Sequence, residues 1–256
     1  MKLLFIGDVV GSSGRAVLTQ NLAALKEQYS IDCTIVNGEN AAHGKGITRR
    51  IYHQITSLGV DAVTMGNHTF SKGELLDFID EADRLVRPMN LLPLEKGKSV
   101  RVIDVLGKKL AVVNLCGQVF MDRIEKSPFV CMEEVLNTVE ADMFLVDLHA
   151  ETTSEKITFA HVFGKKCVGI FGTHTHVQTA DERIIDGCGF ITDAGMCGTW
   201  DSVLGRDKDE VIRHLVYHEP TRYTIATGPA VLCGVVITID DETLRTTAIE
   251  RIQIRP

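Results

Sequence analysis

The segment Cys167-Val168-Gly169-Ile170-Phe171-Gly172-Thr173-His174-Thr175-His176 determines how the rest of this sequence is interpreted. Its apolar half predicts a buried strand, and two histidines at alternate positions follow directly after it. Loops beyond the carboxyl ends of strands are where ligands bind in layered α/β proteins. Two histidines in a loop are common without a metal, so other segments must decide whether they are ligands.

Four other apolar runs end in the same way. Asp8 follows residues 3–6, Glu39 and Asn40 follow residues 34–36, Asn67 and His68 follow residues 62–64, and His149 follows residues 144–148. Strand ends of this kind gather at one edge of a parallel sheet. We therefore infer that these side chains and those of His174 and His176 converge.

Strand-like and helix-like segments alternate along the chain, which predicts a mixed sheet covered by helices. Helical spacing of apolar residues marks residues 16–29, 50–58 and 74–82, with a βα turn at residues 11–14. Two hairpins are expected, pairing residues 100–105 with 110–115 and 231–239 with 244–254. The predicted fold class is α/β, as a four-layer α/β/β/α sandwich with mixed sheets.

Size and composition predict one domain over residues 1–256, since no linker or low-complexity tract interrupts the pattern and 45% of residues are hydrophobic. The apolar runs are far shorter than the roughly 18 residues that span a bilayer. The first strand is too short for a secretory signal, and the seven cysteines show no CxxC spacing. We expect a cytoplasmic protein with reduced thiols and no membrane partner.

The formal net charge of −7 argues against an extended nucleic-acid surface. A small anionic substrate needs only a locally positive site, which a bound metal supplies. The C-terminal hairpin offers an edge that a second copy of the chain could cover, so a homo-oligomer is one expected arrangement.

The polar residues at the strand ends form a ligand set for borderline metal ions. Carboxylate, amide oxygen and imidazole suit Mn, Fe, Zn or Ni, and the absence of thiolates argues against a structural zinc site. Glu39 lies between the two sets of ligands and could bridge two ions. Two ions about 3.5–4 Å apart would activate a shared hydroxide for phosphoester hydrolysis. With only Asp8 and Glu39 as charged ligands, such a centre keeps a positive charge that attracts phosphate.

The motifs, taken together, resemble the calcineurin-like metallophosphoesterase superfamily. The sequence is most similar to its YmdB-like branch of 2′,3′-cyclic-nucleotide phosphodiesterases, and the likeness covers nearly the whole chain. The motifs that carry it are Gly7-Asp8-Val9-Val10-Gly11, Asn37-Gly38-Glu39-Asn40-Ala41-Ala42, Gly66-Asn67-His68-Thr69, His149, Gly172-Thr173-His174-Thr175-His176 and Thr192-Asp193-Ala194-Gly195-Met196-Cys197-Gly198.

The resemblance implies a role for each matching residue. One metal would be held by Asp8, Glu39, Asn40 and His176, and a second by Glu39, Asn67, His149 and His174. His68 would be the catalytic general acid, which protonates the leaving ribose oxygen. The implied cofactors are two divalent or trivalent transition metal ions, with Fe or Mn first and Zn, Ni or Co as alternatives.

This chain departs from the wider superfamily at three positions. The usual Asp-x-His is Asp8-Val9-Val10 here, so Asn40 would replace the missing histidine, and Glu39 replaces the bridging aspartate. Ala42 occupies the place of the aspartate that commonly orients the catalytic histidine. Another group would then have to orient His68.

Three functions remain open at this point. The first is hydrolysis of 2′,3′-cyclic nucleotides, or of cyclic-phosphate RNA ends, by a metal-bridging hydroxide. The second is a phosphomonoesterase or nucleotidase that uses the same centre. The third is a regulatory nucleotide- or RNA-binding protein in which turnover is incidental.

Four further residues also have two interpretations. His43 and Lys45 could contact substrate phosphate or belong to a solvated loop. Trp200 could form a wall of the pocket or part of a buried turn. Glu151 could support His149 or lie on the surface.

Overall fold

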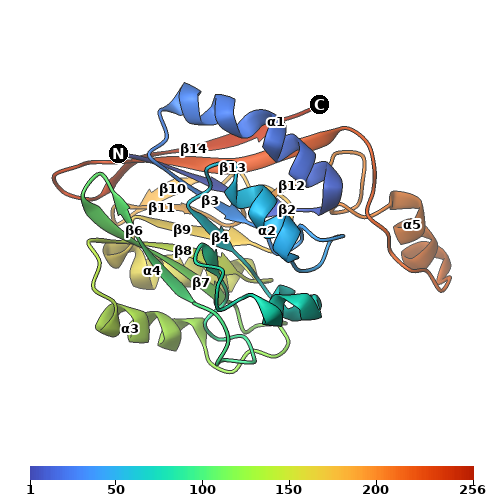
Figure 1. The fold of residues 1–256 in the computed structure, drawn as a ribbon, viewed down its shortest axis with the longest axis horizontal. Coiled ribbons are helices and arrows are strands. Elements are labelled where there is room, and N and C mark those ends of the chain that lie inside the picture. The colour runs from blue at the N-terminus through green and yellow to red at the C-terminus, as the bar shows by residue number, and fades with distance from the viewer.

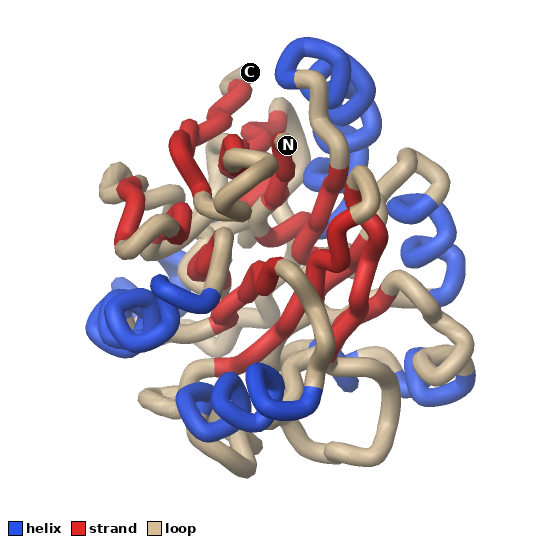
Figure 2. Tube along the Cα trace, turned by 90° about the vertical axis from the view of Figure 1, so that its left-hand side faces the viewer, coloured by secondary structure: helices blue, strands red, loops and turns tan.

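In the computed structural model, which describes residues 1–256, two β-sheets face each other and helices cover their outer sides (Figure 1). The tube in Figure 2 shows the strands in the middle of the molecule with helices around them. The predicted α/β/β/α sandwich is therefore confirmed.

The first sheet has eight strands. Its order is β2 (Asp8–Val9), β12 (Met196–Thr199), β13 (Ala230–Ile239), β1 (Lys2–Ile6), β3 (Cys33–Asn37), β4 (Ala62–Thr64) and β5 (Leu85–Val86), with β14 (Thr246–Ile254) also paired to β13. β1, β3, β4 and β5 run parallel, whereas β13 is antiparallel to β1. The sheet is thus mixed, as predicted.

The second sheet has six strands. Its order is β10 (Arg183–Ile185), β11 (Cys188–Ile191), β9 (Gly169–Thr173), β8 (Met143–His149), β7 (Lys108–Cys116) and β6 (Val100–Val105). β7, β8, β9 and β11 are parallel, so their carboxyl ends share one edge.

The helical segments occupy the connections. They are α1 (Gly11–Tyr29), α2 (Arg49–Thr56), α3 (Pro128–Thr138), α4 (Thr153–Phe163) and α5 (Lys208–Tyr217), with 3-10 turns η1 (Thr69–Ser71), η2 (Gly73–Asp77) and η3 (Gly164–Lys166). In Figure 1, α5 projects from the body of the molecule on the segment between β12 and β13. No helix combines the length and the apolar character needed to cross a bilayer.

The period-2 pattern of β1 shows how the layers form. Leu4 and Ile6 point outward and pack with α1 and α2, whereas Leu3 and Phe5 point inward to the other sheet. The Phe5 ring lies 5.2 Å from the ring of Phe171 on β9. A third apolar cluster packs α3 and α4 on the second sheet. All seven cysteines are buried in these clusters or beside them.

Both predicted hairpins are confirmed, as β6–β7 and β13–β14. The expected turn at residues 11–14 is instead the first turn of α1. Glycine permits this because a Cβ on Gly14 would lie 2.1 Å from the Cys197 carbonyl oxygen, so only glycine allows the helix to approach β12 so closely.

The helix predicted over residues 74–82 is wrong. Leu75, Phe78, Ile79 and Ala82 are buried, as the apolar spacing indicated. The backbone, however, forms only the short turn η2 and leaves the helical region at Phe78, where φ is −142° and ψ is −4°. These side chains can therefore be buried, and can hold this connection against the sheet, without an α-helix.

Candidate metal centre

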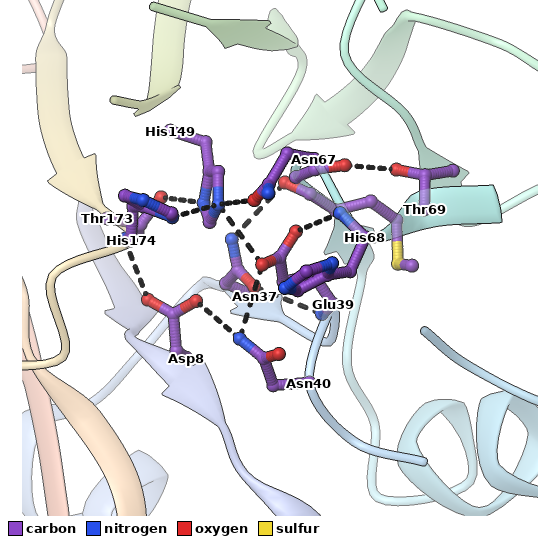
Figure 3. Close-up of polar contacts among 12 residues, drawn as sticks. Asp8, Asn37, Glu39, Asn40, Asn67, His68, Thr69, His149, Thr173 and His174 are labelled. Carbon is purple, nitrogen blue, oxygen red and sulfur yellow. Dashed lines mark hydrogen bonds and ion pairs between the residues drawn. The ribbon is translucent and has the colours of Figure 1, made fainter. Parts of the chain in front are cut away.

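Eight polar side chains meet where the parallel strands end, and Figure 3 labels all of them except His176. They come from the end of β8 and from the segments that follow β1, β3, β4 and β9. The set consists of Asp8, Glu39, Asn40, Asn67, His68, His149, His174 and His176. The structure thus brings together every metal ligand that the sequence predicted, and His68.

One group of ligands surrounds His149. Its Nε2 lies 3.1 Å from Glu39 Oε1, 3.0 Å from Asn67 Oδ1 and 3.1 Å from His174 Nδ1. Glu39 and His149 are buried, and His174 is partly buried. Ligand atoms of Glu39, His149 and His174 all lie within 4.8 Å of one another, the arrangement needed to hold one metal ion.

The second group lies beside the first and shares Glu39 with it. His176 Nε2 is 3.7 Å from Asp8 Oδ1 and 3.1 Å from Asn40 Nδ2. The same amide nitrogen lies 3.3 Å from Asp8 Oδ1 and 3.2 Å from Glu39 Oε1. A metal ligand must present an oxygen instead, so Asn40 would have to turn its amide by 180° to bind an ion here.

The orientation of His149 follows from the groups behind it. Thr173 Oγ1 donates to Asp147 Oδ1 over 2.6 Å, so the 2.9 Å contact between Thr173 Oγ1 and His149 Nδ1 has the histidine as donor. His149 Nε2 therefore has no proton and faces the centre. Burial lowers the pKa of His149 to about 4, which keeps this ring neutral near pH 7.

His174 and His176 are oriented in the same manner. His174 Nε2 lies 3.0 Å from Glu151 Oε2, which leaves Nδ1 toward the centre. His176 Nδ1 donates to the Leu204 carbonyl oxygen over 3.0 Å, which leaves Nε2 toward Asp8. Burial lowers the pKa of His174 to about 4. Glu151 is 49% exposed, which agrees with the surface position, and its carboxylate supports His174 and not His149.

With the protons in these positions, hydrogen-bond acceptor atoms face one another at the centre. The lone pairs of His149 Nε2, His174 Nδ1 and Asn67 Oδ1 converge with a carboxylate oxygen of Glu39 at about hydrogen-bond distance, with no hydrogen between them. Such a cluster is repulsive by itself, and a cation within it converts the repulsion into attraction. The residues present therefore fit a transition metal with nitrogen and oxygen ligands.

A buried ion pair holds the loop that carries His174 and His176. Asp193 accepts from Thr175 N over 3.0 Å and from Thr175 Oγ1 over 2.7 Å, and Lys156 Nζ lies 3.0 Å from the same carboxylate oxygen. Both histidines have left-handed backbones, with φ of 99° at His174 and 65° at His176. Non-glycine residues adopt this conformation only where the surroundings hold them in it.

Glycines keep space open for the ligands. A Cβ on Gly66 would lie 2.1 Å from Glu39 Oε2 and 2.4 Å from His149 Nε2. A Cβ on Gly172 would lie 1.7 Å from the Thr192 carbonyl oxygen. The first glycine is required by the metal ligands themselves, and the second by the close approach of β9 to the Asp193 loop.

His68 lies beside the proposed metal ligands but belongs to neither of their two groups. Its backbone nitrogen donates to Glu39 Oε2 over 3.1 Å, and its ring lines a cavity of about 310 Å³ together with Glu39, Asn40, His174 and His176. Burial lowers the pKa of His68, and Lys45 also lowers it. The ring has no hydrogen bond to another protein group. No side chain therefore takes over the orienting role of the aspartate whose place Ala42 occupies.

The outer wall of this cavity was not foreseen from the sequence. It is formed by the segment around α5, through Val203, Leu204, Arg206, Val211, Leu215 and Tyr223. Trp200 does not line this cavity. Residues 192–199 before it are buried, as the buried-turn interpretation expects, but Trp200 itself is 49% exposed and its ring lies under the Arg255 guanidinium at 5.3 Å. A larger hollow of about 590 Å³ beside the start of α1 contains none of the predicted ligands.

Sequence reasoning also missed Asp147, Lys156 and the role of Asp193. Two signals could have revealed them. Asp147 is a charged residue inside an apolar strand, and Lys156 lies on the apolar face of α4 with Phe159 and Phe163. Charged residues at such positions are rarely buried without a partner.

A model of the YmdB-like protein family matches residues 4–252. The chain belongs to the YmdB-like family. It is 45% identical, over 99% of its length and 97% of the relative's, to a 2′,3′-cyclic-nucleotide 2′-phosphodiesterase of Bacillus subtilis. These comparisons confirm the predicted family.

Solved structures of similar proteins share the fold over the whole chain. The structure of a phosphatase from Mycoplasma pneumoniae has a TM-score of 0.94 and 38% identity, and covers 100% of this chain and 93% of its own. A protein from Thermus thermophilus has a TM-score of 0.92 and 35% identity, and covers 100% of this chain and 99% of its own. The fold of this chain is thus shared with both solved structures over its whole length.

Proposed function

We propose that this protein is a dimetal phosphodiesterase that hydrolyses 2′,3′-cyclic nucleotides. The observation that carries the proposal is the arrangement of three imidazoles and two buried carboxylates. Each imidazole directs an unprotonated nitrogen inward because an outside group takes its other nitrogen. The Bacillus subtilis relative, which is described as a 2′,3′-cyclic-nucleotide 2′-phosphodiesterase, supports the choice of substrate.

The residues divide into two metal sites around Glu39. His149, His174 and Asn67 would hold one ion with it, and Asp8, Asn40 and His176 would hold the other. We propose iron or manganese for these sites, with zinc, nickel or cobalt as alternatives, because carboxylate, amide and imidazole ligands accept all of these ions. When bound, the ions would supply water of lowered pKa and positive charge for the phosphoryl oxygens.

The protein's own groups position the substrate and supply a proton. In the reaction one water adds to the cyclic diester, one bond between phosphorus and a ribose oxygen breaks, and a phosphomonoester with a free hydroxyl results. His68 lines the cavity beside the ligands, where protonated Nδ1 or Nε2 can donate to the departing ribose oxygen. Its lowered pKa makes it a stronger acid than a solvent-exposed histidine.

The test is metal analysis combined with assays. The protein purified without added metal should contain close to two transition metal ions per chain, and should open the four 2′,3′-cyclic nucleotides. The proposal fails if the metal-loaded protein leaves all four cyclic nucleotides and a generic aryl phosphodiester intact.

A phosphomonoesterase is the second candidate, because the similar protein from Mycoplasma pneumoniae is described as a phosphatase. The same protein should then be assayed with nucleoside 2′- and 3′-monophosphates. A higher kcat/KM for the monoesters than for the cyclic diesters would select this function.

A further inference from the structure

Five cationic side chains surround the loop of residues 41–46, which covers Asn40 at the edge of the metal centre. We call them the loop-41 cations: Arg15, Lys45, Arg50, Lys72 and Arg206. None of the five takes part in an ion pair. In a chain with a net charge of −7, a cluster of unpaired cations at one place creates a local positive field that attracts an anionic ligand.

The contacts place these cations around one loop. Arg206 Nη2 donates to the Gly44 carbonyl oxygen over 2.9 Å, and Arg15 Nη1 donates to the Ala41 carbonyl oxygen. Lys72 lies on the other side, since a Cβ on Gly46 would be 3.0 Å from Lys72 Cγ. Both arginines bond only to backbone oxygens of this loop, so most of their N–H donors remain free for a phosphate.

The remaining two cations connect the cluster to its neighbours. Arg50 is exposed in the first turn of α2, four residues beyond Gly46. Lys45 is exposed within the loop itself, and a Cβ on the next residue, Gly46, would lie 3.3 Å from the His68 carbonyl oxygen. The loop-41 cations therefore extend from the catalytic histidine outward over the start of α2.

The cluster continues into the catalytic cavity through Arg206. That cavity also has an apolar side formed by Leu204, Leu215 and Tyr223. The Tyr223 ring is set edge-on to His214 at 5.5 Å, with an angle of 88° between the planes. An aromatic and aliphatic wall beside free cations is how proteins bind single-stranded nucleic acid, with a base on the wall and phosphates on the cations.

We propose that the preferred substrate is the 3′ end of an RNA strand that carries a 2′,3′-cyclic phosphate. Its terminal base lies against Leu204, Leu215 and Tyr223, and its upstream phosphates contact the loop-41 cations. A free cyclic mononucleotide has no second phosphate, so it cannot contact the loop-41 cations in this way. This inference rests on the proposed function and names the substrate class of the same site.

The test compares kcat/KM for 2′,3′-cyclic AMP with that for a dinucleotide and a tetranucleotide that end in the same cyclic phosphate. We expect kcat/KM to rise about tenfold or more from the mononucleotide to the tetranucleotide. The tetranucleotide should also lose activity more steeply with salt, by a slope of about −0.7 for each added phosphate contact.

Variants connect this length dependence to the cluster. Lys45→Gln, Arg50→Gln and Lys72→Gln should each lower kcat/KM for the tetranucleotide several-fold more than for cyclic AMP. The matched control is Lys108→Gln, which removes an exposed charge at the amino end of β7, away from the edge where Cys116 pairs with His149. The control should keep the full length dependence.

The outcomes separate this inference from the proposed function. If all lengths react equally, or if the variants lower activity on every length alike, the inference is overturned and the phosphodiesterase remains. If no cyclic phosphate is opened at any length, the proposed function itself fails. Faster reaction with a phosphoserine peptide than with any cyclic end would assign the cations to a protein substrate and overturn the inference.

Discussion

Lys156 Nζ lies 3.0 Å from Asp193 Oδ2 in the interior of the molecule, and both side chains are fully buried. That carboxylate oxygen also holds Thr175, the residue between His174 and His176. The pair thus fixes the backbone of two proposed metal ligands from behind. It explains how both histidines keep left-handed conformations that would be unfavourable in a free loop.

Asp193→Asn should weaken the metal centre without removing a ligand. The amide cannot balance the Lys156 charge or accept at both oxygens, so the loop loses its support. We expect metal affinity or activity to fall about 10–100-fold, the usual effect of changing a group behind a ligand. Metal titration followed by calorimetry measures it, and wild-type affinity in the variant would contradict this role.

Lys156→Met should lower the free energy of unfolding by about 3–5 kcal/mol, because it leaves the Asp193 carboxylate buried and unpaired. Urea denaturation of the metal-free protein measures the change. Lys98→Met is the control, since Lys98 pairs with Asp83 on the surface and its loss should cost far less than the loss of Lys156. Equal costs at the two sites would refute the prediction.

Gly66→Ala should disturb the metal ligands while the fold persists. The new Cβ would lie 2.1 Å from Glu39 Oε2 and 2.4 Å from His149 Nε2, so both ligands must move. A displacement of about 1 Å at a reacting centre costs on the order of 10²-fold in rate. Gly73→Ala is the matched control, because no atom lies within 4 Å of its added Cβ. Full activity in Gly66→Ala would show that these side chains do not hold the metals.

Removal of the metals should lower Tm. A ligand that binds only the folded chain stabilises it by about 2.7 kcal/mol when present at 100 times its Kd. A chelator should therefore lower Tm by several degrees, and readdition of manganese should restore it. His174→Ala should show a smaller decrease on chelation, and an unchanged Tm in the wild-type protein would count against a metal within the fold.

Much of the fold and the ligand set could be predicted because both depend on local patterns. Apolar runs that end in Asp8, Asn67 or His149 mark strand ends, and parallel strands bring those ends together. The helix expected at residues 74–82 failed for a different reason. Its apolar residues are buried as predicted, but tertiary packing is satisfied by a short 3-10 turn.

The groups that determine how the ligands face could not be predicted. His176 is oriented by the carbonyl oxygen of Leu204, and every residue has such an oxygen, so no side-chain pattern identifies it. The cavity wall with Arg206 and Tyr223 lies on a segment that has no recognisable motif. Such contacts depend on how distant segments pack, and a single sequence does not show this.

The central claim is that the imidazoles of His149, His174 and His176 bind metals while His68 transfers a proton. It is tested most directly by comparing His68→Ala with His174→Ala for bound metal and for hydrolysis of 2′,3′-cyclic AMP. We predict that His68→Ala keeps close to two metals per chain and loses about 10²–10⁴-fold in kcat. His174→Ala should lose metal together with activity. Loss of metal in His68→Ala, or full activity in either variant, would contradict the assignment.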